Sequence, residues 1–156
     1  MYPHYYDYYQ RESVKSMDFG PQPFIVDIQK ATKDNQNYRT ALWTGNHLQL
    51  TVMDLAPGED IGLEIHPDVD QFLYVIEGVG RVEMGDRKDH LPFQQLAFSD
   101  DANIIPAMTW HDVTNVGKDH LKIFSIYGPP NHPWGTIHQT KDIAESMENH
   151  ESKSIQ

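Results

Sequence analysis

The stretch EIHPDVDQFLYVIEG, residues 64–78, combines a β-strand pattern with side chains that can ligate metals. Its second half is rich in aromatic and β-branched residues and runs into a Gly78-Val79-Gly80 turn, which predicts a hairpin with a strand at 81–85. Its first half places Glu64 and His66 two positions apart, so on a strand both side chains would point to the same face. The stretch is therefore either half of a metal site or a hairpin whose polar residues hold no ligand.

Outward from this stretch, short predicted strands separated by turns continue in both directions. Their spacing is typical of an all-β sandwich or barrel. The segment 47–56 shows the clearest alternation, with Leu48, Leu50 and Val52 against Gln49 and Thr51. The strands are predicted at 24–29, 40–45, 47–56, 71–78, 81–85, 94–99, 102–106, 112–116 and 121–128.

The two ends of the chain differ from this pattern. Residues 1–23 contain five tyrosines in the first ten positions and show no periodicity, which predicts an extended arm. Such an arm is either a free tail or a contact with the same or a neighbouring subunit, because tyrosine is apolar with a polar tip. Residues 139–156 predict a short helix with Thr140 as N-cap and Ile143, Ala144 and Met147 on one face. Residues 24–138 form the predicted barrel domain between them.

Composition excludes several classes of protein. The 156 residues suit one domain, and the absence of cysteine removes disulfides, thiolate metal sites and cysteine nucleophiles. A net charge of −11 argues against a nucleic-acid partner. No apolar run approaches the roughly 18 residues of a membrane span, and no signal peptide is evident. We therefore expect a cytoplasmic protein with no membrane partner.

Two segments together carry a family resemblance. PGEDIGLEIHPDVDQFLYVIEG (57–78), followed by DDANIIPAMTWHDVTN (100–115), resembles the paired motifs of the cupin superfamily, and the likeness extends over about residues 40–128. The chain is most similar to small single-domain bacterial cupins named for similarity to phosphomannose isomerase. The resemblance implies a single-domain β-barrel of the jelly-roll type. It also implies four metal-ligand positions, which in this chain are Glu64, His66, Gln71 and His111.

The donor set departs from the family pattern of three histidines and one glutamate. Here the carboxylate has moved from the fourth position to the first, and a neutral amide, Gln71, stands where the family has its glutamate, so the total charge of the set is unchanged. Such nitrogen and oxygen donors suit Mn²⁺, Fe²⁺, Ni²⁺ or Zn²⁺. Glu64 lies between apolar neighbours, and an unpaired carboxylate there would cost several kcal/mol. A metal, protonation of Glu64 or an ion pair with a charged histidine would each relieve that cost, so a metal-free polar pocket is the alternative.

Other positions near these motifs bear on the site. Met108 replaces the glycine that the family places in a tight turn, which predicts either a rearranged turn or roughly 1 kcal/mol or more of strain. Trp43, Phe72 and Tyr127 are candidates to line the cavity, although aromatic strand residues are more often core.

The function expected from this pattern is a metal-binding cupin that binds or acts on a small molecule, such as a sugar or a small carboxylic acid. The sequence does not establish that it is an enzyme. The alternative is a non-catalytic ligand-binding or assembly module with a degenerate metal site. We also expect a homodimer, because barrels of this size leave edge strands unpaired, and the segment 24–29 could add a strand to a partner.

Overall fold

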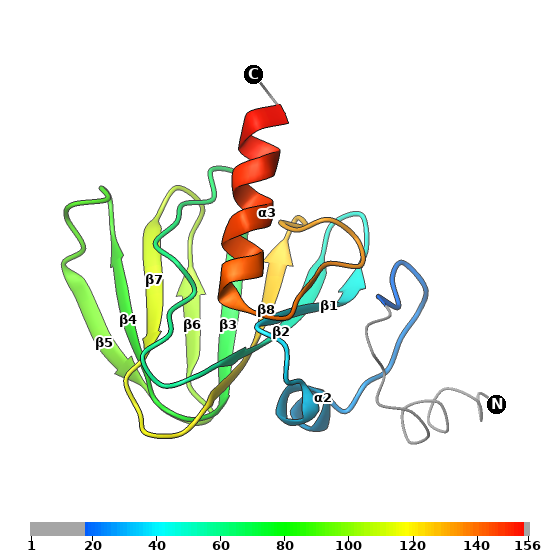
Figure 1. The fold of residues 1–156 in the computed structure, drawn as a ribbon, viewed down its shortest axis with the longest axis horizontal. Coiled ribbons are helices and arrows are strands. Elements are labelled where there is room, and N and C mark those ends of the chain that lie inside the picture. Colours follow the sequence, from blue (N-terminus) through cyan, green and yellow to red (C-terminus); the bar gives the residue numbers. More distant parts are fainter. Residues whose placement is uncertain (1–17, 155–156) are drawn as a thin grey trace.

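The computed structural model describes residues 18–154, which form two antiparallel sheets with a helix at each end of the described chain (Figure 1). The larger sheet has the strand order β6-β3-β8-β2-β1-β9, and the smaller has the order β5-β4-β7. This architecture confirms the predicted all-β jelly-roll class. The strands are β1 (Arg39–Thr44), β2 (Gln49–Leu55), β3 (Asp70–Glu77), β4 (Gly80–Gly85), β5 (Phe93–Ala97), β6 (Ala102–Ile105), β7 (Trp110–Asn115), β8 (Leu121–Gly128) and β9 (Ile137–His138).

The register of the central strands divides the barrel interior into a polar half and an apolar half. Gln49, Tyr127 and Gln71 lie in one row across β2, β8 and β3, and all three are buried. Towards the other end of these strands, the row of Met53, Ile123 and Val75 is equally buried. Because side chains in alternate positions of a strand share a face, all these rows point between the two sheets. One end of the barrel is therefore a packed core, and the other is a polar chamber.

In β2 the polar residues face the barrel interior and the apolar residues face outwards, which is the reverse of a simple apolar core. Gln49 and Thr51 are fully buried inside the barrel, whereas Leu50 and Val52 face the outside of the larger sheet. That outer face is itself covered, because a second cluster of apolar side chains packs there against helix α2 (Ile28–Asp34). The strand thus has two buried faces, one of them polar.

The predicted strand at 24–29 is wrong. Asp27 caps α2, and its side chain accepts a hydrogen bond from the backbone N–H of Lys30 (3.0 Å). Ala31 and Thr32 are the buried residues of this helix, which packs on β2, β3 and β8. The apolar residues of the segment therefore cover the outer face of the sheet and pair with no strand.

The predicted C-terminal helix is confirmed as α3 (Lys141–Ser154), and the backbone N–H of Ile143 donates to Thr140 Oγ1 at its start (3.2 Å). Of the three apolar residues predicted on one face, only Ala144 is buried in the core, while Ile143 and Met147 are exposed. Lys141 pairs with Asp60 and ties the first turn to the loop after β2. Between residues 18 and 154, no helix is both long and apolar enough to cross a membrane. The predicted tyrosine arm lies largely outside the described residues, which begin at Asp18.

Candidate metal centre

Glu64 and His111 are brought together by the backbone. Glu64 lies in the irregular segment between β2 and β3, where it forms an isolated antiparallel bridge with His111 of β7. The N–H of Glu64 donates to the carbonyl of His111 (3.1 Å), and the N–H of His111 donates back to the carbonyl of Glu64 (2.9 Å). A directly opposed pair of this kind places its two side chains side by side. The bridge therefore links the two motifs of the sequence at their ligand positions.

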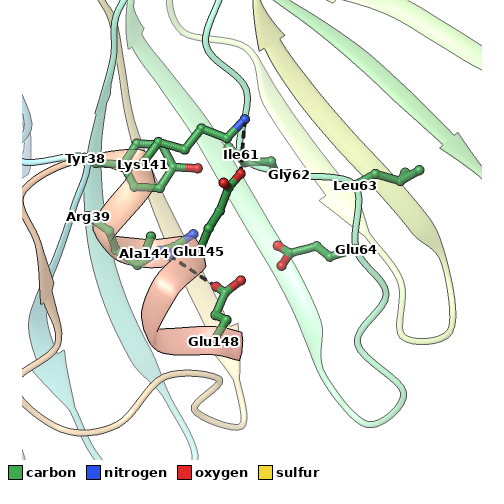
Figure 2. Close-up of a pocket in the computed structure, with 10 residues that line it drawn as sticks. All are labelled: Tyr38, Arg39, Ile61, Gly62, Leu63, Glu64, Lys141, Ala144, Glu145 and Glu148. Atoms are coloured by element: carbon green, nitrogen blue, oxygen red, sulfur yellow. Dashed lines mark ion pairs between the residues drawn. The ribbon is translucent and has the colours of Figure 1, made fainter. Parts of the chain in front are cut away.

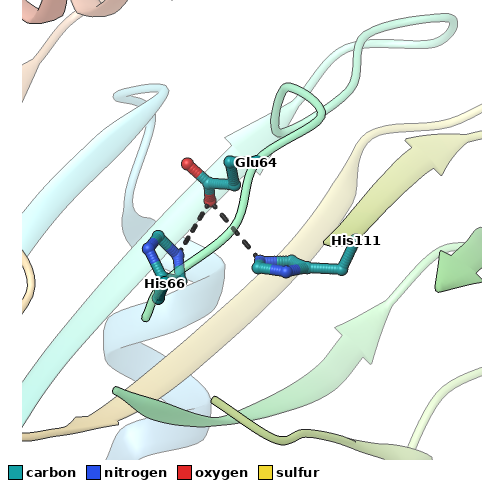
Figure 3. Close-up of side chains that lie close together, drawn as sticks. All are labelled: Glu64, His66 and His111. Atoms are coloured by element: carbon teal, nitrogen blue, oxygen red, sulfur yellow. Dashed lines mark ion pairs between the residues drawn. The ribbon is translucent and has the colours of Figure 1, made fainter. Parts of the chain in front are cut away.

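Three of the four predicted ligands form one cluster (Figure 3). Glu64 Oε1 lies 3.2 Å from His66 Nε2 and 3.6 Å from His111 Nε2. One ligand atom from each residue falls within 4.8 Å of the other two. His111 is fully buried and His66 nearly so, while the side chain of Glu64 is 23% exposed and provides the opening to solvent. The group is thus able to hold a metal ion.

Hydrogen bonding orients His111 for ligation. Its Nδ1 lies 2.9 Å from the backbone carbonyl of Thr109, and because a carbonyl only accepts, Nδ1 carries the proton. In the neutral ring Nε2 is then unprotonated, so it can ligate a metal through its lone pair, and it faces Glu64. This is the arrangement in which metal-bound histidines are held by a partner on the other ring nitrogen.

Glu64 is held as a carboxylate despite its burial. Burial alone would raise its pKa, but the adjoining His111 and His66 imidazoles and the positive charge of Arg39 outweigh that effect and hold the pKa of Glu64 below its usual range. Glu64 therefore contributes a negative charge to the cluster, and protonation of Glu64 is not the means by which the cluster is stabilised.

Gln71, the fourth predicted ligand, lies on β3 inside the polar chamber. Its Nε2 donates to Ser125 Oγ (3.1 Å) and to Tyr127 Oη (3.4 Å). These two bonds use the amide nitrogen and leave Oε1 as the remaining atom, and Oε1 is buried with no hydrogen-bond partner in the described chain. That Gln71 ligates a metal together with Glu64, His66 and His111 stays a prediction.

The unpaired atoms fit a cation. His66 Nε2, His111 Nε2 and Gln71 Oε1 are buried and make no hydrogen bond to any described residue. A buried polar atom without a partner is costly, typically about 1–3 kcal/mol. Each of the three atoms is able to offer a lone pair, which a divalent transition metal would satisfy together with the carboxylate of Glu64. The residues present thus fit the metal that the sequence predicts.

The turn at Met108 keeps the conformation that the family glycine would adopt. Met108 has a φ of 65° and is 62% exposed, so the strain predicted for this residue is present and the turn is not rearranged. Its N–H donates to the carbonyl of His66 (2.9 Å), and Asp70 Oδ1 accepts from the N–H of Ala107 (2.8 Å). The turn therefore connects the segment that carries His66 to the strand that carries His111.

The three predicted pocket aromatics lie in different places. Tyr127 is buried in the polar chamber, and its ring centre lies 6.1 Å from that of His66. Phe72 packs in the apolar cluster on the outer face of the larger sheet, against Tyr74 and Phe124. Trp43 donates its indole N–H to the carbonyl of Gln22 (2.7 Å) in an exposed contact. Of the three, the structure brings only Tyr127 to the cluster.

Sequence reasoning missed part of the polar chamber. Gln49 Oε1 accepts from the N–H groups of Asn131 (3.0 Å) and His132 (2.9 Å), and its Nε2 donates to the carbonyl of His132 (2.8 Å). These bonds dock the Pro-rich segment after β8 against the barrel. The ring of His132 then packs on Tyr127, with the ring centres 5.4 Å apart. Burial and the charge of Arg39 lower the pKa of His132 to about 3. The sequence signal for this chamber was the alternation in β2, where polar residues alternate with apolar ones.

A cavity of about 260 Å³ lies between α3 and the loop that carries Glu64 (Figure 2). In Figure 2 the carboxylate of Glu64 points across this cavity towards the side formed by β1 and α3. Arg39, at the start of β1, is 1% exposed and lines the cavity together with Glu64. No sequence signal marked Arg39 as a site residue, because a single arginine at a strand start carries no motif.

Comparison with known proteins agrees with this geometry. A family model described as a cupin domain matches residues 51–127. The chain is 55% identical over 140 residues to the uncharacterized protein YrkC of Bacillus subtilis, and this alignment covers 90% of this chain and 75% of that protein. It is also 38% identical over 119 residues to the uncharacterized protein L612 of a mimivirus of Acanthamoeba polyphaga, covering 74% of this chain and 71% of that protein.

A solved structure matches over most of its length. The crystal structure of BH2720 from Bacillus halodurans superposes with a TM-score of 0.82 and 58% sequence identity, covering 83% of this chain and 98% of that chain. The names of these three proteins state no activity. The comparisons establish kinship and fold, and the chemistry of the site rests on its side chains.

Proposed function

Because the chain belongs to the cupin family, we propose that it binds a divalent transition metal through Glu64, His66, Gln71 and His111 and uses that site to bind a small molecule in the barrel. Mn²⁺, Fe²⁺, Ni²⁺ and Zn²⁺ all suit this donor set. The observation that carries the proposal is the set of buried lone-pair atoms without hydrogen-bond partners among the described residues, on His66, His111 and Gln71, around a carboxylate that remains ionised.

The residues of the chain would prepare the site in distinct ways. Thr109 fixes the tautomer of His111, and the Met108 turn holds the backbone of His66. Burial raises the pKa of Tyr127, so its hydroxyl stays protonated and can donate a hydrogen bond to a ligand in the chamber. A bound metal would supply Lewis acidity towards a carbonyl or hydroxyl oxygen of the ligand, or a binding position for O₂. Glu64 cannot serve as both a tight ligand and a free general base.

The cavity beside Glu64 supports a small ligand. Its volume of about 260 Å³ is below the range of about 300–1,000 Å³ that is usual for drug-sized ligands. Glu64 both belongs to the cluster and lines the cavity, so a molecule in the cavity would lie next to the metal. This supports a small molecule as the partner of the site over a macromolecule.

The test is metal content and affinity of the full chain. The protein would be stripped with a chelator, reconstituted separately with each of the four metals, and analysed by mass spectrometry for metal per chain. We expect close to one metal per chain for the natural sequence and almost none for His66→Ala. His90→Ala is the matched control, because His90 is an exposed histidine that pairs with Asp86 and is not part of the cluster.

Two results would contradict the proposal. One is a natural protein that binds none of the four metals. The other is a His66→Ala variant that binds metal as well as the natural protein does. Either would favour the alternative, a metal-free polar pocket in a binding or assembly module. Thermal unfolding of each variant, followed by circular dichroism, separates loss of the site from loss of the fold.

A further inference from the structure

Arg39 is an almost fully buried cation that lines the cavity. Its side chain is 2% exposed, and its Nε is buried without a hydrogen-bond partner in the described part of the chain. Arginine remains charged in proteins and is rarely buried unless it is paired. The unused Nε leaves part of this buried cation without a hydrogen-bond partner among the described residues.

The groups around Arg39 do not neutralise its charge fully. Its Nη1 lies 3.1 Å from His138 Nδ1, and since arginine only donates, this histidine nitrogen accepts. Burial and the charge of Arg39 lower the pKa of His138 to about 4, so the ring is neutral at pH 7. The anionic contact is Glu148 of α3, whose Oε1 lies 3.8 Å from Nη1 on a half-exposed side chain. That separation is longer than a hydrogen bond and is partly screened by water.

Arg39 and Glu64 line the same cavity from different elements (Figure 2). Arg39 comes from β1, at the edge near β9, and Glu64 comes from the loop that leads to β3. A small ligand between them would therefore meet the metal cluster at one end and the guanidinium group at the other. The lining of the cavity holds two cations, Arg39 and Lys141, and three carboxylates, Glu64, Glu145 and Glu148, so a divalent cation at the cluster would bring its net charge from −1 to +1.

We propose that the cavity selects small carboxylates, with Arg39 binding the carboxylate group while another oxygen of the same molecule reaches the metal cluster at Glu64. This inference rests on the proposed metal-dependent function and names the class of its ligand. The planar fork of arginine matches a carboxylate with two parallel hydrogen bonds, and such charge-assisted bonds are stronger than those to neutral groups. A neutral sugar would leave the buried charge unmatched, so Arg39 disfavours it.

The test measures ligand binding by calorimetry to the metal-loaded full chain. The probes are acetate, malonate and L-malate, with inorganic phosphate and the neutral sugar D-mannose for comparison. The variants are Arg39→Gln, which removes the charge, and Arg39→Lys, which keeps the charge and removes the fork. Glu148→Gln removes the competing anion from the exposed side. Arg87→Gln is the matched control, because Arg87 is an exposed arginine outside the cavity.

We expect at least one carboxylate to bind, and Arg39→Gln to weaken that binding about tenfold to a hundredfold, as for loss of a charged hydrogen bond. Arg39→Lys should fall between, Glu148→Gln should bind the carboxylate more tightly, and Arg87→Gln should match the natural protein. Should Arg39→Gln fail to fold, the opposite shifts of Arg39→Lys and Glu148→Gln carry the test.

The inference is overturned if none of the carboxylates binds, if Arg39→Gln binds them as well as the natural protein, or if phosphate or D-mannose binds more tightly than every carboxylate. Metal content is measured on the same samples. A natural protein without metal therefore contradicts the proposed function, whereas full metal occupancy without carboxylate binding contradicts this inference alone.

Discussion

Glu64 and His111 form a single antiparallel β-bridge with both backbone hydrogen bonds made, and their side-chain ligand atoms lie 3.6 Å apart. Backbone pairing thus places this carboxylate and this imidazole side by side. Preorganised ligands lose little conformational entropy on binding, which favours affinity. The pairing also explains how a glutamate at the position of a family histidine still reaches the site.

The contribution of Gln71 can be separated from that of the other ligands. We expect Gln71→Ala to weaken metal binding least among alanine variants of the four residues, because a neutral amide oxygen is a weak donor that water can replace. Gln71→Glu adds a second negative charge beside the cation and should tighten binding. The measurement is metal affinity by competition with a chelator. A Gln71→Glu variant that binds more weakly than the natural protein would place Gln71 outside the ligand set.

Replacing Met108 by glycine should stabilise the protein. The left-handed conformation costs a non-glycine residue roughly 1–2 kcal/mol, and the greater freedom of glycine in the unfolded chain offsets about 0.4–1 kcal/mol of the gain. Met108 is mostly exposed, so little apolar burial is lost. We expect a net gain of about 0.5–1 kcal/mol in the free energy of unfolding, measured by urea denaturation.

Ala107→Gly is the matched control for Met108→Gly. Ala107 is the preceding residue of the same turn and does not have a positive φ. Glycine there relieves no strain and only increases the freedom of the unfolded chain, so it should lower stability by about 0.4–1 kcal/mol. Equal effects of the two substitutions would show that the Met108 conformation stores no strain.

His132 should make the protein sensitive to acid. Its folded pKa of about 3 lies below the unfolded value of about 6.5. Above pH 6.5 the ring is neutral in both states, and its full contribution to stability is present. As the pH falls below 6.5, the unfolded chain takes up a proton that the folded chain refuses, so the free energy of unfolding decreases. The decrease is about 1.4 kcal/mol per pH unit for one such group.

His132→Gln tests this assignment. Between pH 7 and pH 5 the metal-free variant should lose about 2 kcal/mol less of its free energy of unfolding than the natural protein loses. The measurement is urea denaturation at both pH values in the presence of a chelator. His47→Gln, at an exposed histidine, should follow the natural protein. If His132→Gln and His47→Gln show the same pH dependence, His132 is not the source.

The homodimer stays a prediction, but the segment on which it was based does not form a strand. The segment at 24–29 that was expected to add a strand to a partner is partly helical and packs on its own sheet. The strands β5 and β6 are at the edges of their sheets. Light scattering of the full chain at micromolar concentration is expected to give twice the monomer mass, and a monomer mass would contradict the prediction.

Much of the fold follows from local pattern. The hairpin at 71–85 and the strands up to residue 128 are all where alternation and turn residues predict them, because those signals come from neighbouring positions. The segment at 24–29 failed because six apolar and polar residues suit a strand or a first helical turn equally well. The Asp27 cap and the apolar outer face of β2, β3 and β8, on which the segment packs, favoured the helix.

The sequence by itself determined the class of the site: two spaced motifs placed Glu64, His66 and His111, and the structure brings those three together. Only the tertiary structure decided the rest of the chamber. The alternation of Gln49 and Thr51 with Leu50 and Val52 is compatible with either a polar or an apolar barrel interior. Helix α2 buries Leu50 and Val52 on the outer face of the sheet, so Gln49 and Thr51 face the interior. Arg39 reaches the cavity through strand pairing alone, since residues far apart in the chain share a surface only after the sheets have closed.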